Sequence, residues 1–267
     1  MFATLKTHAA VGALVAALLL PVGPTFAEDE APAKVELGDN PTVEQILAAI
    51  DQNMVFESRT ATVKMVVEGK RRTRSFEMVT YGRGVDDSAM EYVAPAREKG
   101  TKMLKLGDDL WMYMPSIDKT QKISGHMLRQ GMMGSDLSYE DMMASDELAN
   151  MYQASVVGTE DVDGRPAWKL ELNATDDSVA YPKRVQWIDK ETYIPVKQEL
   201  FALSGMKLKS WTMTDIKEFE GGRKFPTRME IVDEVKADSR TILEFGEMTF
   251  GVELEDEVFS QRWLERK

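Results

Sequence analysis

An alternation of apolar and polar side chains with a period of two runs through most of this chain after Arg59. In the first run, Ala61, Val63, Met65 and Val67 alternate with Thr62, Lys64, Val66 and Glu68. Successive side chains of a β-strand point to opposite faces of a sheet, so this period indicates strands with one buried face. A chain dominated by such runs buries its apolar side chains chiefly in sheet structure.

Turn residues such as Asp163-Gly164 and Gly221-Gly222 separate the runs at short intervals, as they do between antiparallel strands. The further runs cover residues 71–81, 101–106, 110–114, 120–124, 154–159, 167–172, 184–189, 195–203, 207–219, 228–234 and 241–252. We count about eleven strands in all and expect a mainly β fold with a few helices, built as one continuous meander. A sheet of this size has to curl and to be covered on one face.

Helices are expected at both ends of the strand series. Thr42 and Gln45 have the spacing of a capping box, and an amphipathic helix follows with Val43, Ile46, Leu47 and Ile50 on one face. A second short helix should begin at Asp256 and carry Val258, Phe259, Trp263 and Leu264. Residues 125–150 interrupt the strands and are expected to form a helical or irregular insertion.

The first 27 residues have the pattern of a secretory signal peptide. Lys6 precedes an apolar run from Ala9 to Leu20, and small residues at Thr25 and Ala27 suit a signal peptidase. About twenty apolar residues are needed to span a bilayer, so this run is too short for an anchor, and we expect cleavage after Ala27. Residues 28–40 then read as a flexible leader, and residues 41–267 as a single domain.

Composition limits the environment and the partners. The chain has no cysteine, which excludes disulfides and thiolate chemistry, and an exported protein that folds without bridges suits a bacterial periplasm. The formal net charge of −12 disfavours nucleic acid as a partner and favours solubility. We expect a monomer.

Enzymatic chemistry has weak support in this sequence. After cleavage His126 is the one remaining histidine, and a hydrolase could be written with Ser124 or Ser138, but no G-x-S-x-G elbow is present. A metal site from His126, Asp136, Glu140 and Asp141 lacks the paired ligands of zinc sites. No P-loop or G-x-G-x-x-G motif occurs, so we predict no cofactor, no metal and no catalytic residue.

Methionine is concentrated between Leu110 and Met143, where seven occur in 34 residues. Methionine is flexible and polarisable, so a wall of methionines can adapt to ligands of different shape. The glycines at 131 and 134 favour a movable cover, although a buried core beneath a loop explains the same composition. The predicted ligand-binding residues are Trp111, Met112, Tyr113, Met114, Met127, Leu128, Met132, Met133, Met142 and Met143.

The same stretch resembles exported proteins known as outer membrane lipoprotein-sorting proteins, relatives of the periplasmic lipoprotein carrier LolA and of LolB. The resemblance lies in the sequence LWMYMPSIDKTQKISGHMLRQGMMGSDLSYEDM, with Lys119 and Lys122 in a basic turn, then MGSD at 133–136 and SYED at 138–141. It implies a half-open antiparallel β-barrel whose concave apolar face is closed by helices, with acyl chains bound inside. The arginine that holds the cover in the carrier could correspond to Arg59, Arg71, Arg72 or Arg74.

The function implied by this resemblance is that of a non-enzymatic periplasmic carrier or chaperone for the acyl chains of lipoproteins or lipids. Its partners would be an outer-membrane acceptor or an inner-membrane transporter of the resistance-nodulation-division type. Two alternatives remain open from the residues. The chain could be a structural adaptor docked to such a transporter, or a hydrolase that uses His126.

Overall fold

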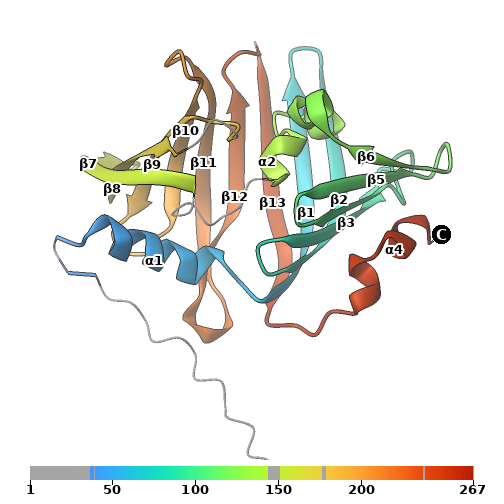
Figure 1. The fold of residues 1–267 in the computed structure, drawn as a ribbon, viewed down its shortest axis with the longest axis horizontal. Coiled ribbons are helices and arrows are strands. Elements are labelled where there is room, and N and C mark those ends of the chain that lie inside the picture. Colours follow the sequence, from blue (N-terminus) through green and yellow to red (C-terminus); the bar gives the residue numbers. More distant parts are fainter. Residues whose placement is uncertain (1–36, 39, 144–150, 176–178, 237, 267) are drawn as a thin grey trace, which may run out of the picture. The chain divides into compact units, whose positions relative to one another are not determined.

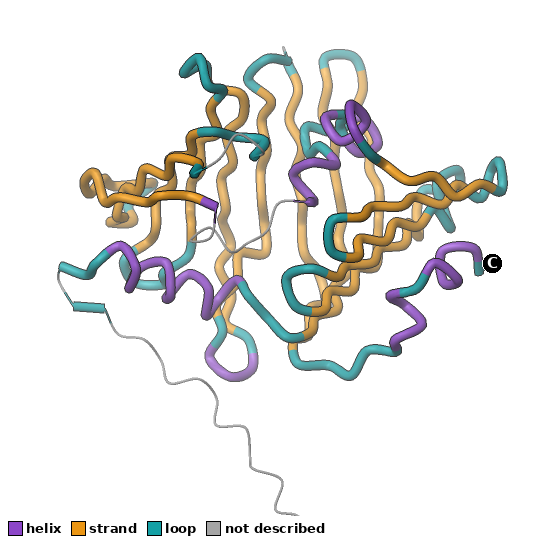
Figure 2. Tube along the Cα trace, in the orientation of Figure 1, coloured by secondary structure: helices purple, strands orange, loops and turns teal. Residues whose placement is uncertain are grey.

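The computed structural model describes residues 37, 38, 40–143, 151–175, 179–236 and 238–266. Within these ranges the chain forms one sheet of thirteen antiparallel strands that does not close on itself, together with three α-helices and four 3-10 turns. Figure 1 shows the sheet with helices α1 and α2 on one side of it, and Figure 2 shows that strands make up most of the trace. The mainly β prediction is confirmed. No helix in the described ranges is long and apolar enough to cross a membrane.

The helices and strands have the following bounds. The elements up to residue 143 are α1 (Val43–Met54), β1 (Ser58–Gly69), β2 (Arg72–Arg83), β3 (Asp87–Ala94), β4 (Lys102–Leu106), β5 (Asp109–Met114), β6 (Lys119–Ile123), η1 (Gly125–Arg129), η2 (Met132–Gly134) and α2 (Tyr139–Met143). Those after it are β7 (Tyr152–Val162), β8 (Arg165–Ala174), β9 (Lys183–Asp189), β10 (Pro195–Phe201), β11 (Lys207–Glu218), η3 (Glu220–Gly222), β12 (Lys224–Asp233), β13 (Ser239–Phe250), η4 (Asp256–Phe259) and α4 (Gln261–Glu265).

The first strand pairs with the last. The order across the sheet is β6-β5-β4-β3-β2-β1-β13-β12-β11-β10-β9-β8-β7, with Met65 of β1 opposite Leu243 of β13. Strands β6 and β7 follow each other in the chain but lie at opposite edges of the sheet. The expected continuous meander is therefore wrong at this step, and the chain between Ile123 and Tyr152 has to cross from one edge to the other. We call this part of the chain the crossing segment.

The core lies mainly on one face of the sheet, which we call the inner face. Alternate residues of β1, β2, β12 and β13, among them Val63, Met65 and Ile231, form its larger cluster together with residues of the crossing segment. A second inner cluster joins α1 to β8 and β9 through Ile46, Leu170 and related side chains. The period-two pattern predicted from the sequence thus corresponds to the buried side of the strands.

Helix α1 has the predicted capping box. The Gln45 amide donates to Thr42 Oγ1 at 3.3 Å, and the Thr42 amide donates to Gln45 Oε1 at 2.9 Å. Its apolar side packs on the inner face, where Ile46 is fully buried. At the other end Asn53 joins the helix to the β9–β10 turn and to β12, since Nδ2 donates to the Thr192 carbonyl at 3.2 Å and Oδ1 accepts from the Lys224 amide at 2.9 Å.

The C-terminal segment covers part of the outer face. Trp263 and Leu264 of α4 pack against Leu104 and Tyr113. Lys102 stabilises this end of the chain because its ammonium donates to the carbonyls of Trp263 at 3.1 Å and Arg266 at 2.7 Å. These carbonyls lie at the C-terminal end of α4, where the helix dipole favours a positive charge. The predicted final helix is present as two short pieces, η4 and α4, separated at Ser260.

Other expectations are corrected or lie outside the described ranges. The structure has thirteen strands rather than about eleven, and β3 was missed because its buried side chains, Ala89 and Tyr92, are embedded among Asp87, Glu91 and other polar residues. The signal peptide at 1–27, nearly all of the leader at 28–40 and residues 144–150 of the insertion fall outside what the structure describes.

We predict that Asn53→Leu destabilises the protein by about 2 kcal/mol, because it leaves the part-buried Lys224 amide and the buried Thr192 carbonyl without their partner. Urea unfolding of the variant measures the free-energy change. Ala48→Ser, on the exposed side of the same helix, is the control and should change stability by about 0.5 kcal/mol or less. Equal effects of the two changes would contradict this role of Asn53.

Candidate ligand-binding cavity

A cavity of about 270 Å³ lies on the inner face, between α1 and strands β9 to β13. It is lined by Ile50, Met54, Phe56, Arg59, Asp141, Tyr181, Arg184, Gln186, Pro195, Gln198, Leu200, Trp211, Met213, Phe225, Met229 and Phe245. Most of these side chains are apolar, and several belong to the larger inner core cluster. The cavity is therefore an opening within the core rather than a surface depression.

Aromatic rings and Arg59 form one wall of the cavity. The Arg59 guanidinium lies 4.6 Å from the ring centre of Phe56, 5.4 Å from that of Phe225 and 5.8 Å from that of Phe245. A guanidinium over aromatic faces is stabilised by the ring quadrupoles, so the cation can be kept in an apolar setting. This wall combines an apolar surface with a positive charge.

The opposite wall is polar. In the sheet register Gln186 of β9 lies beside Gln198 of β10, and Gln198 lies beside Trp211 of β11. Gln186 Nε2 donates to Gln198 Oε1 at 2.5 Å, whereas Gln186 Oε1 and Trp211 Nε1 are buried without a hydrogen-bond partner among the described residues. Arg184 precedes Gln186 by two residues and is also buried. One wall of an otherwise apolar cavity thus presents several polar groups.

Residues 125–143, which we call the cover segment, cross the inner face after β6. Its side chains Met127, Leu128, Met132, Met133, Met142 and Met143 pack into the larger inner cluster together with Met112 of β5. Local geometry explains why glycine occupies positions 131 and 134. A Cβ at Gly131 would collide with the carbonyl of Ser135, and Gly134 has φ of +70°. The methionine-rich stretch therefore lies over the sheet, as a cover would.

The predicted site residues divide between the two faces. Met112, Met127, Leu128, Met132, Met133, Met142 and Met143 are brought together on the inner face. Trp111 and Tyr113 instead belong to the outer cluster beneath α4, because adjacent residues of β5 point to opposite faces. Met114 is partly buried at the end of β5. None of the ten lines the 270 Å³ cavity, so their contact with a ligand stays a prediction.

Arg74 of β2 holds the middle of the cover segment. Its Nη1 donates to the Met133 carbonyl at 2.7 Å and its Nη2 to the Gly134 carbonyl at 3.0 Å. Charge-assisted hydrogen bonds of this kind are stronger than neutral ones. Among the four arginines considered from the sequence, the structure places Arg74 against the cover segment and Arg59 in the cavity.

Asp136 forms a second attachment of the cover segment. Its carboxylate is buried and accepts from Ser239 Oγ at 2.7 Å and from Thr241 Oγ1 at 2.8 Å, both on β13. Its own amide donates to Thr241 Oγ1 at 2.8 Å. The aspartate of the MGSD motif therefore has a structural role at the sheet surface.

The SYED motif provides the third attachment. Asp141 forms an ion pair with Lys209 of β11 and accepts from the Ser138 amide and hydroxyl, each at 2.7 Å. Burial raises the pKa of Tyr181 above its usual value, and the nearby Asp141 charge adds to the shift. The Tyr181 hydroxyl therefore stays protonated and donates to Asp141 Oδ1 at 2.6 Å.

These contacts bear on the catalytic alternatives. Asp136, Ser138 and Asp141 are engaged in holding the cover segment. His126 is exposed on η1 and forms no hydrogen bond with Ser124 or Ser138 in the described part of the chain. The described residues contain no group of three or more histidine, aspartate or glutamate side chains placed to hold a metal ion. The proposed hydrolase and metal constellations are not assembled among these residues.

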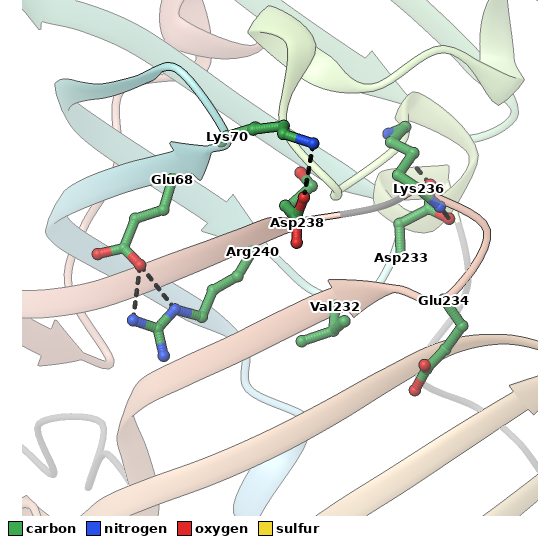
Figure 3. Close-up of a pocket in the computed structure, with 10 residues that line it drawn as sticks. Glu68, Lys70, Val232, Asp233, Glu234, Lys236, Asp238 and Arg240 are labelled. Carbon is green, nitrogen blue, oxygen red and sulfur yellow. Dashed lines mark hydrogen bonds and ion pairs between the residues drawn. The ribbon is translucent and has the colours of Figure 1, made fainter.

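A larger depression of about 460 Å³ lies at the turns β1–β2 and β12–β13 (Figure 3). Its charged side chains face one another, with Arg240 3.5 Å or less from Glu68 and Glu230, and Lys70 3.6 Å from Asp238. Lys236 pairs with Asp233 at 3.1 Å. The depression lacks the apolar lining of the cavity and does not suit an apolar ligand.

The polar wall was missed by sequence reasoning. Arg184 and Gln186 are alternate residues of β9 with the apolar Val185 between them, and Gln198 of β10 precedes Leu200, which lines the same cavity, by two positions. Polar residues at positions expected to be buried could have drawn attention to this wall. Their meeting at one cavity depends on sheet register, which the local pattern does not supply.

A family model described as "Uncharacterized protein" matches residues 84–266. Comparison with curated proteins gives no match. A solved structure from Vibrio parahaemolyticus, described as an outer membrane lipoprotein-sorting protein domain, is similar with a TM-score of 0.73 and 23% identity, over 84% of this chain and 96% of that one. A LolA superfamily protein from Nitrosomonas europaea gives 0.70 and 24%, over 84% of this chain and 100% of that one. The chain therefore has the LolA-like fold of outer membrane lipoprotein-sorting protein domains and belongs to the family whose model matches residues 84–266.

Proposed function

We propose that this protein is a non-enzymatic carrier of acyl chains in the periplasm. The observation that carries the proposal is the 270 Å³ cavity with mostly apolar lining inside a LolA-like sheet. Each methylene moved from water into such a setting contributes about 0.8 kcal/mol before the costs of ordering. Eight methylenes would contribute about 6 kcal/mol before those costs are subtracted.

In this proposal the sheet acts as a half-open barrel and the cover segment closes its inner face. Seven of the predicted ligand-binding residues already lie in the inner cluster next to the cavity, so a moderate shift of the cover segment would bring them against a longer chain. Methionine suits this role because its side chain repacks readily. Arg74 would set how easily the segment opens, since it bonds to backbone carbonyls of that segment.

The cargo would be the acyl chains of lipoproteins or of lipids, received from or delivered to a membrane protein. The similar Vibrio parahaemolyticus domain is described as an outer membrane lipoprotein-sorting protein domain, which supports this class of cargo. The signal peptide pattern at residues 1–27 supports export and cleavage after Ala27. Organic extraction of protein purified from its native periplasm, followed by mass spectrometry, would identify bound lipid. A permanent adaptor would copurify with protein and without lipid.

We predict that Met213→Trp lowers the affinity for a fluorescent fatty-acyl probe at least tenfold, because the larger ring fills the cavity that Met213 lines. The fold should persist with a loss of about 1–3 kcal/mol at most, since the ring enters existing space. Probe titration and thermal unfolding of the same sample provide the two readings.

The matched control is Thr214→Trp, which adds the same ring to the exposed face of the same strand. It should leave the probe affinity within twofold of the unmodified protein. An unchanged affinity in a well-folded Met213→Trp variant would show that acyl chains do not enter this cavity.

A further prediction concerns the attachment by Arg74. In Arg74→Gln the two bonds to the Met133 and Gly134 carbonyls are lost or weakened, so amide hydrogen exchange in residues 132–137 should accelerate about tenfold or more. Arg72→Gln, an exposed change in the same strand, should leave this exchange unaltered. Equal exchange rates in the two variants would remove Arg74 from the control of the cover segment.

A further inference from the structure

The polar wall contains a buried cation. Arg184 is 8% exposed, and its Nε donates to Tyr152 Oη at 2.8 Å. Its guanidinium carbon lies 4.7 Å from the ring centre of Tyr152 and 5.7 Å from that of Tyr181, which positions the group on two aromatic faces. No described carboxylate forms an ion pair with Arg184, although a guanidinium offers five N–H donors suited to an oxyanion.

Two residues that line the same cavity each carry a buried polar atom without a partner among the described residues. Gln186 is only 3% exposed, and its Oε1 accepts no hydrogen bond there. Trp211 Nε1 is a buried donor that likewise has no described partner. Trp211 lies two strands from Gln186, and both are paired with Gln198 in the sheet. Buried polar groups are normally paired, and each unpaired group costs free energy, so these atoms point to a ligand that pairs with them.

The charge inside the cavity is positive, although the chain as a whole carries −12. Asp141 is the one acidic residue of the lining, and its charge is compensated by Lys209 and by donors from Ser138 and Tyr181. Arg184 adds a positive charge, and no described carboxylate forms an ion pair with it. An anion is therefore favoured here, whereas a cationic head group would be repelled and a neutral one would leave Arg184 without a counter-charge.

Combining these observations, we infer that the cavity recognises single-chain amphiphiles with an anionic oxyacid head, bound by Arg184 and Trp211, with the acyl chain along the apolar lining. This inference rests on the proposed function and adds a head-group specificity to it. A carboxylate and a phosphate monoester share the required oxygens. A phosphate monoanion also keeps an O–H donor near its second ionisation at about pH 6, and that donor can pair with Gln186 Oε1.

The test compares three twelve-carbon ligands that differ only in the head, dodecanoate, dodecyl phosphate and 1-dodecanol, by calorimetric titration at pH 6. The unmodified protein should bind at least one anionic ligand ten times or more tightly than the alcohol, and the tighter of the two identifies the head-group source. Arg184→Gln should remove that preference and leave the affinity for the alcohol within twofold. Arg228→Gln makes the same charge change outside the cavity lining and is the control.

Two milder variants keep the test decisive if Arg184→Gln does not fold. Arg184→Lys retains the cation, and should keep part of the preference for anionic ligands. Trp211→Phe removes one unpaired donor, and should weaken the anionic ligands about threefold or more without affecting the alcohol. Equal binding of all three ligands to the unmodified protein would overturn the head-group inference and leave the carrier proposal standing. Absence of binding by any of them would overturn both.

Discussion

The pairing of the first strand with the last is the constraint on which the rest of the structure depends. With β1 hydrogen-bonded to β13, the strands before and after the crossing segment extend away from a central pair, and their final members become opposite edges of the sheet. The chain between β6 and β7 then has no route within the sheet, and its described part, residues 125–143, lies over the inner face. The cover segment is thus a consequence of topology. Met132 is buried and the other methionines of the segment are partly buried because that face is apolar.

The cover segment is held to this face by polar contacts at three points, each linking it to a different strand. Arg74 bonds from β2, Ser239 and Thr241 from β13, and Lys209 from β11. A buried ion pair adds little net stability compared with apolar packing, but removing one partner is costly. Such contacts fix where the segment lies, while its flexible methionines pack against the inner cluster.

Local patterns predicted the local structure well. The capping box at Thr42 and the period-two runs specified α1 and most strands, because propensity and one buried face are both readable from short stretches. The β1–β13 pairing joins residues almost two hundred positions apart, and no short pattern encodes it. The same limit applies to the site, since Trp111 and Met112 are both large and apolar and the sequence alone does not tell which of them faces inward. Arg184 and Trp211 meet at one cavity only through register.

Strands β6 and β7 are the two edges of the sheet and do not pair with each other, which has a mechanical consequence. No ladder of hydrogen bonds joins these two strands, so the two groups of strands on either side of β1 and β13 can change their mutual twist without breaking a backbone bond between neighbours. A closed barrel has a circumference set by its strand number and stagger and resists such a change. This sheet is compliant where a closed barrel would be stiff, so the volume on its inner face can change at low energetic cost.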